Sequence, residues 1–93
     1  EKRKEEVTVK TQLFRDLLKN RLIKDVRTAG LLIAVEFESF EINKKIIDQC
    51  IEHGLITDWF LFAPECMRIA PPLVITEDEI RKACKIILGA CGD

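Results

Sequence analysis

Two adjacent prolines, Pro71 and Pro72, limit how this chain can fold more than any other feature. Proline fixes its own φ angle and has no backbone N–H to donate, so neither a helix nor an inner strand can run through the pair. The apolar stretch of residues 66–70 is therefore predicted to end there as a strand. A new helix is predicted to begin shortly afterwards, because Thr76 and Glu79 have the spacing of a capping box.

The segment after Thr76 predicts a helix that ends near Gly92. Acidic residues at 77–79 suit the positive end of a helix dipole. Apolar residues recur at steps of three and four, which predicts one buried helix face. These residues are Ile80, Ala83, Cys84, Ile87, Leu88 and Cys91.

Two further helices are predicted upstream, over about residues 3–20 and 41–53, and Gly54 is suited to cap the second one. The first has an apolar stripe of Val7, Thr11, Phe14, Leu18 and Leu22, and the second has one of Ile42, Ile46, Ile47, Cys50 and Ile51.

Residues 23–27 and 31–38 are rich in β-forming side chains and predict a hairpin, with residues 28–30 as a tight connection. Gly30 can take the positive φ that such a turn needs. In the second strand of the hairpin the apolar side chains alternate, which predicts one buried face and one wet face. The buried face would carry Leu31, Ile33, Val35 and Phe37.

Residues 55–63 predict a third strand, residues 63–65 a short turn, and residues 66–70 a fourth strand. Four consecutive apolar residues at 59–62 are typical of a strand covered on both faces. One helical layer covers only one face, so the other face is expected to meet a part that this chain lacks. The predicted fold class is α+β, a small, mainly antiparallel sheet of about four strands with helices on one face.

Composition indicates one domain and excludes several classes of partner. The chain has 93 residues, with 15 basic and 16 acidic side chains. This balance argues against nucleic-acid binding and against a polybasic membrane tether. No apolar run approaches the roughly 20 residues that span a bilayer. The start, EKRKEEVTVK, has neither an initiator Met nor a signal core, so we expect a fragment of a longer chain.

The four cysteines lie at 50, 66, 84 and 91 and form no CxxC pair. Free thiols without a disulfide framework suit a reducing, cytoplasmic environment. Cys50 and His53 have the weakest metal-ligand spacing, and no second pair completes a zinc site. We therefore expect no metal, and we expect His53 to be a helix-end residue rather than a catalytic base.

Arg68 is the candidate site residue. It lies in the predicted fourth strand, on the face that it shares with Cys66 and Ala70, and the prolines fix where that strand ends. A guanidinium fork there matches a carboxylate through two parallel hydrogen bonds, which lysine cannot copy. The spacing alone leaves two alternatives: an external carboxylate, or a local pair with a Glu of this chain or with water.

The stretches DVRTAGLLIAVEFE, EHGL and MRIAPPLVITEDEI occur in this order from about residue 22 to the end. Together they resemble the C-terminal part of class-III pyridoxal-phosphate aminotransferases. In that family a Val-Arg-Gly-x-Gly-Leu hairpin and an Arg-x-x-Pro-Pro-Leu-x-Ile-Thr stretch precede the last helix. One departure is Thr28, which replaces the first glycine of the hairpin.

The resemblance implies that residues 1–93 are the small C-terminal domain of a fold-type I enzyme, with residues 1–21 as a lead-in helix and residues 22–93 as the α+β body. It implies that Arg68 binds the substrate carboxylate. It places pyridoxal 5'-phosphate and every catalytic group on an absent large domain, so the fragment alone is expected to be inactive. It implies a cytoplasmic homodimer acting on an amino acid and a 2-oxo acid such as 2-oxoglutarate.

The amino donor stays open among ornithine, acetylornithine, 4-aminobutyrate and diamines, and a mutase or a decarboxylase stays open as the parent enzyme. A different class of function is a free-standing regulatory module that binds an amino acid without chemistry. The apolar run at 59–62 argues against that module, because it would leave an exposed apolar patch on a monomer. An RNA-binding sheet is a weaker alternative, since those aromatics lack a basic, glycine-containing setting.

Overall fold

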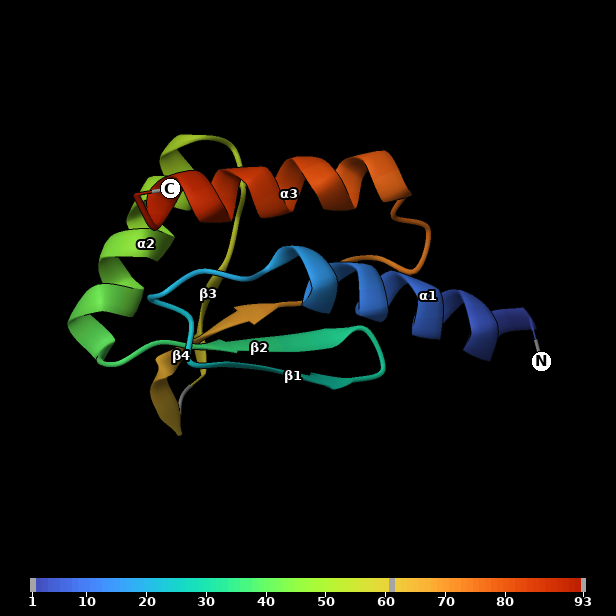
Figure 1. The fold of residues 1–93 in the computed structure, drawn as a ribbon, viewed down its shortest axis with the longest axis horizontal. Helices are drawn as coiled ribbons and strands as arrows, with labels where there is room; N and C mark the ends of the chain where they lie inside the picture. Colours follow the sequence, from blue (N-terminus) through green and yellow to red (C-terminus); the bar gives the residue numbers. More distant parts are fainter. Residues whose placement is uncertain (1, 61, 93) are drawn as a thin grey trace.

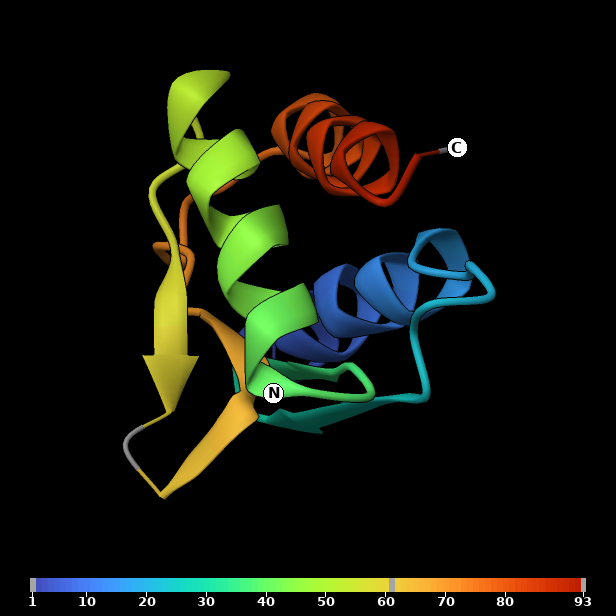
Figure 2. The ribbon, with the colours of Figure 1, turned by 90° about the vertical axis from the view of Figure 1, so that its left-hand side faces the viewer.

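The computed structural model describes residues 2–60 and 62–92, which form a four-stranded sheet with helices on one face (Figure 1; Figure 2). The last strand of the chain lies inside the sheet, between the second and the third, and every neighbouring pair of strands is antiparallel. The predicted α+β class is confirmed. Along the chain the elements are α1 (Lys2–Leu17), β1 (Asp25–Ala29), β2 (Leu32–Glu36), α2 (Phe40–Glu52), β3 (Asp58–Phe60), β4 (Ala63–Ile69) and α3 (Glu77–Ala90), and the sheet order is β1-β2-β4-β3.

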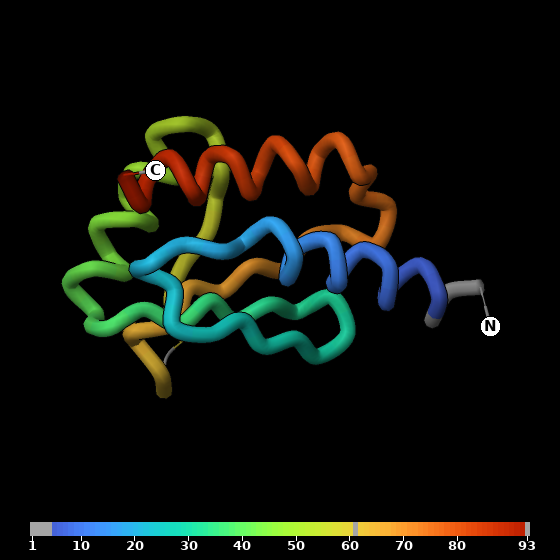
Figure 3. Tube along the Cα trace, viewed as in Figure 1, coloured from blue at the N-terminus to red at the C-terminus, as the bar shows by residue number. Residues whose placement is uncertain are grey.

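The core lies between the sheet and the helices. Alternation in β2 holds as predicted, because Ile33 and Val35, with Phe37 just beyond the strand, are fully buried. Met67 and Ile69 of β4 lie on the same side of the sheet. The helices complete the core with their apolar stripes, and α1 packs alongside α3 (Figure 3). Their buried residues include Phe14, Leu18, Ile46, Ile47, Cys50, Ile80, Cys84, Ile87 and Cys91.

The hairpin of β1 and β2 differs slightly from its prediction. Thr28 and Ala29 belong to β1 and pair with Ile33 and Leu32, so the turn is shorter than residues 28–30. Gly30 has φ +59, which confirms its predicted role. Thr28, where the resembling family has glycine, needs no positive φ because it is an ordinary strand residue here.

The boundary between β3 and β4 was predicted wrongly. The third strand is only Asp58–Phe60, with an irregularity between Trp59 and Phe60, and β4 already begins at Ala63. The predicted turn at residues 63–65 therefore lies inside β4. Pro64 is tolerated near the start of this strand, where its carbonyl accepts a hydrogen bond from Asn43 Nδ2 at 2.8 Å.

The predicted cap of α3 is confirmed. Thr76 Oγ1 accepts from the Glu79 backbone N–H at 3.2 Å, and Glu79 Oε1 accepts from the Thr76 N–H at 2.9 Å. The hydrogen bonds that the Thr76 N–H and hydroxyl donate to the Glu79 carboxylate lower the pKa of Glu79. The helix ends at Ala90, with Cys91 as its C-cap, and Gly92 follows with φ +88. None of the helices in the described part combines the length and apolarity needed to cross a membrane.

Candidate functional site

The face of the sheet turned away from the helices, called the outer face below, carries a row of residues from all four strands. The strand registers pair Arg27 with Ala34, Ala34 with Arg68, and Arg68 with Asp58. Neighbouring residues in such a row are about 5 Å apart. Ala34 therefore separates two arginines, and Asp58 ends the row at the β3 edge of the sheet.

Arg68 forms a two-point ion pair with Asp58. Its Nε donates to Oδ1 at 2.8 Å and its Nη2 donates to Oδ2 at 2.9 Å. The hydrogen bonds and charge of Asp58 raise the pKa of the guanidinium further above its ordinary value. Thr57, the residue before Asp58, also holds the backbone of Arg68, because its Oγ1 donates to the Arg68 carbonyl at 2.6 Å.

Of the two alternatives that the sequence left open for Arg68, the structure shows the local ion pair, although the acid is an Asp rather than a Glu. The Arg68 side chain lies on the outer face, not against the helices, and is 47% exposed. The guanidinium holds the Asp58 carboxylate through two parallel hydrogen bonds, which is the geometry expected for a substrate carboxylate. Binding of an external carboxylate by Arg68 stays a prediction.

Arg27 is held by more partners than Arg68. Its Nη1 donates to Glu36 Oε1 at 2.8 Å and to Asp25 Oδ2 at 3.1 Å, and its Nη2 contacts Cys66 Sγ at 3.4 Å. Hydrogen bonds to the two acids raise its pKa. Burial raises the pKa of the Cys66 thiol, while the nearby guanidinium opposes that effect. Sequence analysis missed this cluster, since its partners come from three strands.

An apolar hollow of about 280 Å³ adjoins the Arg27 cluster on the outer face. Phe62 at its rim is 96% exposed, and Ile56 elsewhere on the chain is 90% exposed. The hollow extends from Ala34, at the centre of the sheet, to the turn between β3 and β4. Its lining residues are Arg27, Ala34, Phe60, Phe62, Ala63 and Cys66.

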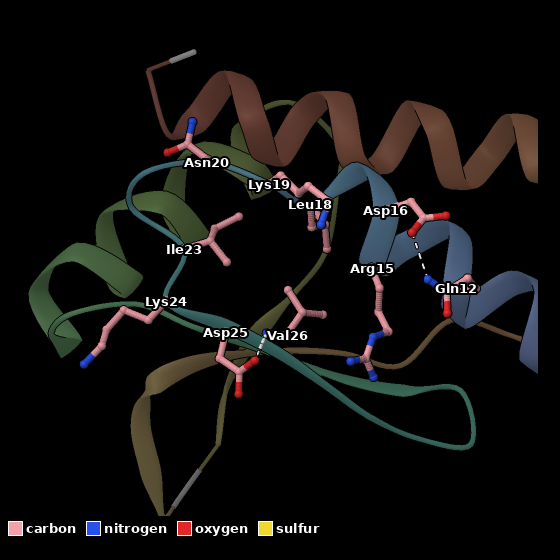
Figure 4. A pocket seen from close by; sticks show the side chains of 10 residues that line it. All are labelled: Gln12, Arg15, Asp16, Leu18, Lys19, Asn20, Ile23, Lys24, Asp25 and Val26. Carbon is pink, nitrogen blue, oxygen red and sulfur yellow. Dashed lines mark hydrogen bonds between the residues drawn. The ribbon is translucent and has the colours of Figure 1, made fainter.

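A second hollow, of about 430 Å³, lies between the end of α1 and β1 (Figure 4). Its polar groups do not converge on one point. Gln12 Nε2 donates to Asp16 within α1 at 2.8 Å, Asp25 Oδ1 accepts from the Val26 N–H, and Lys24 is directed to one side. We assign no chemistry to this hollow.

Cys50 and His53 do not form a metal site in the described residues. Cys50 is buried in the core, whereas His53 is exposed at the end of α2 with Nδ1 2.9 Å from the Gln49 carbonyl. A search of the described part of the chain finds no group of three or more His, Cys, Asp or Glu residues that could hold a metal ion. All four cysteines are buried, free thiols.

Comparison with known proteins identifies the family. The family model of class-III aminotransferases matches residues 1–91. The chain belongs to the class-III aminotransferases. The match includes α1, so the family likeness extends further upstream than the residue 22 at which the sequence motifs begin.

Individual relatives of this class-III chain agree with the family. It is 38% identical over 68 residues to the acetylornithine aminotransferase of Bifidobacterium longum, covering 73% of this chain and 15% of that protein. It is 35% identical over 89 residues to that of Corynebacterium efficiens, covering 95% of this chain and 21% of that protein. A structure of Toxoplasma gondii ornithine aminotransferase matches with a TM-score of 0.79 and 31% identity, covering 96% of this chain and 22% of that one. The active site of that structure is partly occupied by pyridoxal phosphate.

Members of the class-III family use pyridoxal phosphate, so the described lysines of this chain are the groups to compare with its Schiff-base site. A lysine that forms a Schiff base with a carbonyl compound is activated by desolvation or by a neighbouring cation. Every lysine whose side chain is described is exposed or half-buried: Lys10, Lys19, Lys24, Lys44, Lys45, Lys82 and Lys85. None of these described lysines is buried, so none has the desolvated setting that activates such a lysine.

Proposed function

We propose that this chain is the C-terminal small domain of a longer aminotransferase, and that Arg68 binds the carboxylate of its substrate. The enzyme would move an amino group between an amino acid or amine donor and a 2-oxo acid such as 2-oxoglutarate. Membership of the class-III family supports this proposal, as does the small part of each relative that the chain spans, between 15% and 22% in those described above.

The observation that carries the proposal is the geometry of Arg68. A planar fork on the outer face already holds a carboxylate through two nearly equal hydrogen bonds. A substrate carboxylate needs the same two-point contact, which fixes both its position and its orientation. Such an anchor lets the remainder of the enzyme act on a substrate that is correctly aligned, while the cofactor supplies the electron sink.

The rest of the site belongs, in this proposal, to a large domain of the same chain that binds pyridoxal 5'-phosphate. That domain would cover the outer face and supply every catalytic group. Ile56 and Phe62, exposed by 90% and 96%, support such a covering partner over a free-standing module. We propose a cytoplasmic homodimer, with no nucleic-acid or membrane partner, in keeping with the formal charge of −1.

The test is Arg68→Lys in the full-length enzyme. Because the fork becomes a point charge and at least one charge-assisted hydrogen bond is lost, we expect kcat/KM for L-glutamate and 2-oxoglutarate to fall roughly tenfold or more. Steady-state kinetics with both substrates measure it. Arg27→Lys is the matched control, since it makes the same change on the same face away from Arg68. An unchanged kcat/KM in Arg68→Lys would rule out the proposed role.

A further inference from the structure

We infer that Asp58 is a positioning residue, which holds one edge of the Arg68 guanidinium so that the other edge is presented to the substrate carboxylate. The inference rests on the proposed function, and it adds which edge of the fork is used and which residue fixes it. Asp58 is not part of the sequence motif around Arg68, because it lies ten positions upstream on another strand.

A guanidinium has two edges that can each bind a carboxylate through a pair of N–H groups. The side edge consists of Nε and Nη2, and the end edge consists of Nη1 and the second hydrogen of Nη2. Asp58 occupies the side edge of Arg68, at 2.8 and 2.9 Å. Among the described residues, no partner binds Nη1. The end edge therefore keeps a complete pair of donors, fixed in the plane that Asp58 sets.

Two consecutive residues, Thr57 and Asp58, hold Arg68 at two points. Asp58 is the register partner of Arg68 across the sheet, which brings its short carboxylate to the Nε edge. Thr57, one residue earlier and 7% exposed, donates its hydroxyl hydrogen to the Arg68 carbonyl. The backbone of Arg68 is thus restrained by Thr57, just before β3, and its side-chain end by Asp58, the first residue of β3. The pairing becomes irregular immediately afterwards, between Trp59 and Phe60, so this restraint is local.

Arg27 differs from Arg68 in the edge of the guanidinium that the chain's own residues occupy. Both of its terminal nitrogens have partners, with Nη1 shared by two carboxylates and Nη2 against the Cys66 sulfur. Both hydrogens of Nη1 are thus engaged, so the end edge of Arg27 has no free pair of donors for a ligand. Of the two arginines in the outer-face row, Arg68 is the one whose end edge is open among the described residues.

Asp58 has two opposite effects on an incoming carboxylate. It orders a long, flexible side chain in advance, and loss of that order is expected to raise KM about threefold to tenfold. Its negative charge also repels the substrate, but this repulsion is strongly screened at about 1 M salt, where the Debye length is about 3 Å. The positioning effect does not depend on salt in this way. Measurements at high ionic strength therefore isolate it.

The experiment compares Asp58→Asn with Asp25→Asn in the full-length enzyme at about 1 M KCl. Both variants remove one negative charge from the outer face, but Asp25 contacts Arg27 and not Arg68. An asparagine at 58 turns an amide N–H₂ toward one of the two donors, so the two-point hold is lost. We expect KM for 2-oxoglutarate to rise about threefold to tenfold in Asp58→Asn, with kcat within about twofold of the parent enzyme, and neither to change in Asp25→Asn.

A second readout needs no turnover. Glutarate, a dicarboxylate without the reacting oxo group, should raise the Tm of the parent enzyme and of Asp25→Asn more than that of Asp58→Asn. If Asp58→Asn behaves as Asp25→Asn does, or if its KM falls, the inference is overturned while the substrate role of Arg68 stands. If Arg68→Lys leaves kcat/KM unchanged, the proposed function fails first, and the role of Asp58 fails with it.

Discussion

The two faces of the sheet are built on different principles. On the helix-covered face, Ile33, Val35 and Met67 are completely buried by the three helices. On the outer face, β1 and β4 present Arg27 and Arg68, and their positions are fixed by ion pairs with acids on neighbouring strands. The first face is held by excluded water and packing, and the second by charge partners at particular positions of the register.

The covered face therefore contributes most of the stability, whereas the outer face directs charged side chains. A buried apolar side chain contributes through its area, so many exchanges of similar volume are tolerated. A charged pair that is half-exposed contributes little to stability, but it defines a direction for a side chain. The outer face can therefore change its chemistry without loss of the fold, which suits a surface that meets a substrate.

The largest expected effect follows from removing a side chain on the covered face. Phe37 is completely buried, so Phe37→Ala should lower the free energy of unfolding by about 3–5 kcal/mol. Phe62→Ala makes the same change at a side chain that is 96% exposed, and it should stay within about 0.5 kcal/mol of the parent chain. Urea denaturation measures both. Similar losses in the two variants would show that the outer side of the turn is packed as tightly as the core.

The covered face is also the part that sequence patterns predict well. Alternation at residues 31–37 identified the buried side of β2, and the Thr76–Glu79 spacing identified the start of α3. Both signals are local, because they depend on the strand and helix periods alone. The boundary at residues 60–63 failed for a related reason: four apolar residues look like one strand, although Phe62 lies on an exposed turn.

The candidate site could be predicted only in part. Arg68 was singled out as a candidate from its strand, the prolines after it and the family resemblance, and its substrate role stays a prediction. Its partner Asp58 was not predicted, because the pair depends on the register between β3 and β4. That register is set by a hairpin whose turn was misplaced by several residues. The partners of Arg27 were missed in the same way. Ion pairs between residues on different strands can be predicted only when the register of the strands is known, and a single sequence does not give that register.

A pH-dependent effect should distinguish the two faces through their thiols. Burial raises the pKa of Cys50 to about 11 and that of Cys84 to about 12, from an ordinary value of about 9. The folded chain therefore holds these protons more tightly than the unfolded chain does. Their contribution to stability is complete below pH 9 and is lost as the pH rises toward 11 and 12.

Urea denaturation between pH 8 and about pH 10.5 measures this loss, in a range set by the ordinary thiol pKa. Cys84→Val removes the ionisable group at similar volume, so its stability should decline less steeply with pH than that of the parent chain. Cys66→Val should alter the slope less, because Arg27 on the outer face opposes the effect of burial on that thiol. Equal slopes in the parent chain and in Cys84→Val would contradict a raised thiol pKa in the core.

The smallest expected effect lies where the two faces meet, at Thr57. Its buried hydroxyl donates to the Arg68 carbonyl at 2.6 Å, and Thr57→Val keeps the shape while it removes that donor. We expect a loss of about 1 kcal/mol in the free energy of unfolding by urea denaturation, the usual net contribution of one hydrogen bond. Thr28→Val in β1 is the matched control, because no hydrogen bond of the Thr28 hydroxyl occurs among the described residues, and it should stay within about 0.5 kcal/mol of the parent chain. If Thr57→Val is as neutral as the control, then Asp58 restrains Arg68 without a measurable contribution from Thr57.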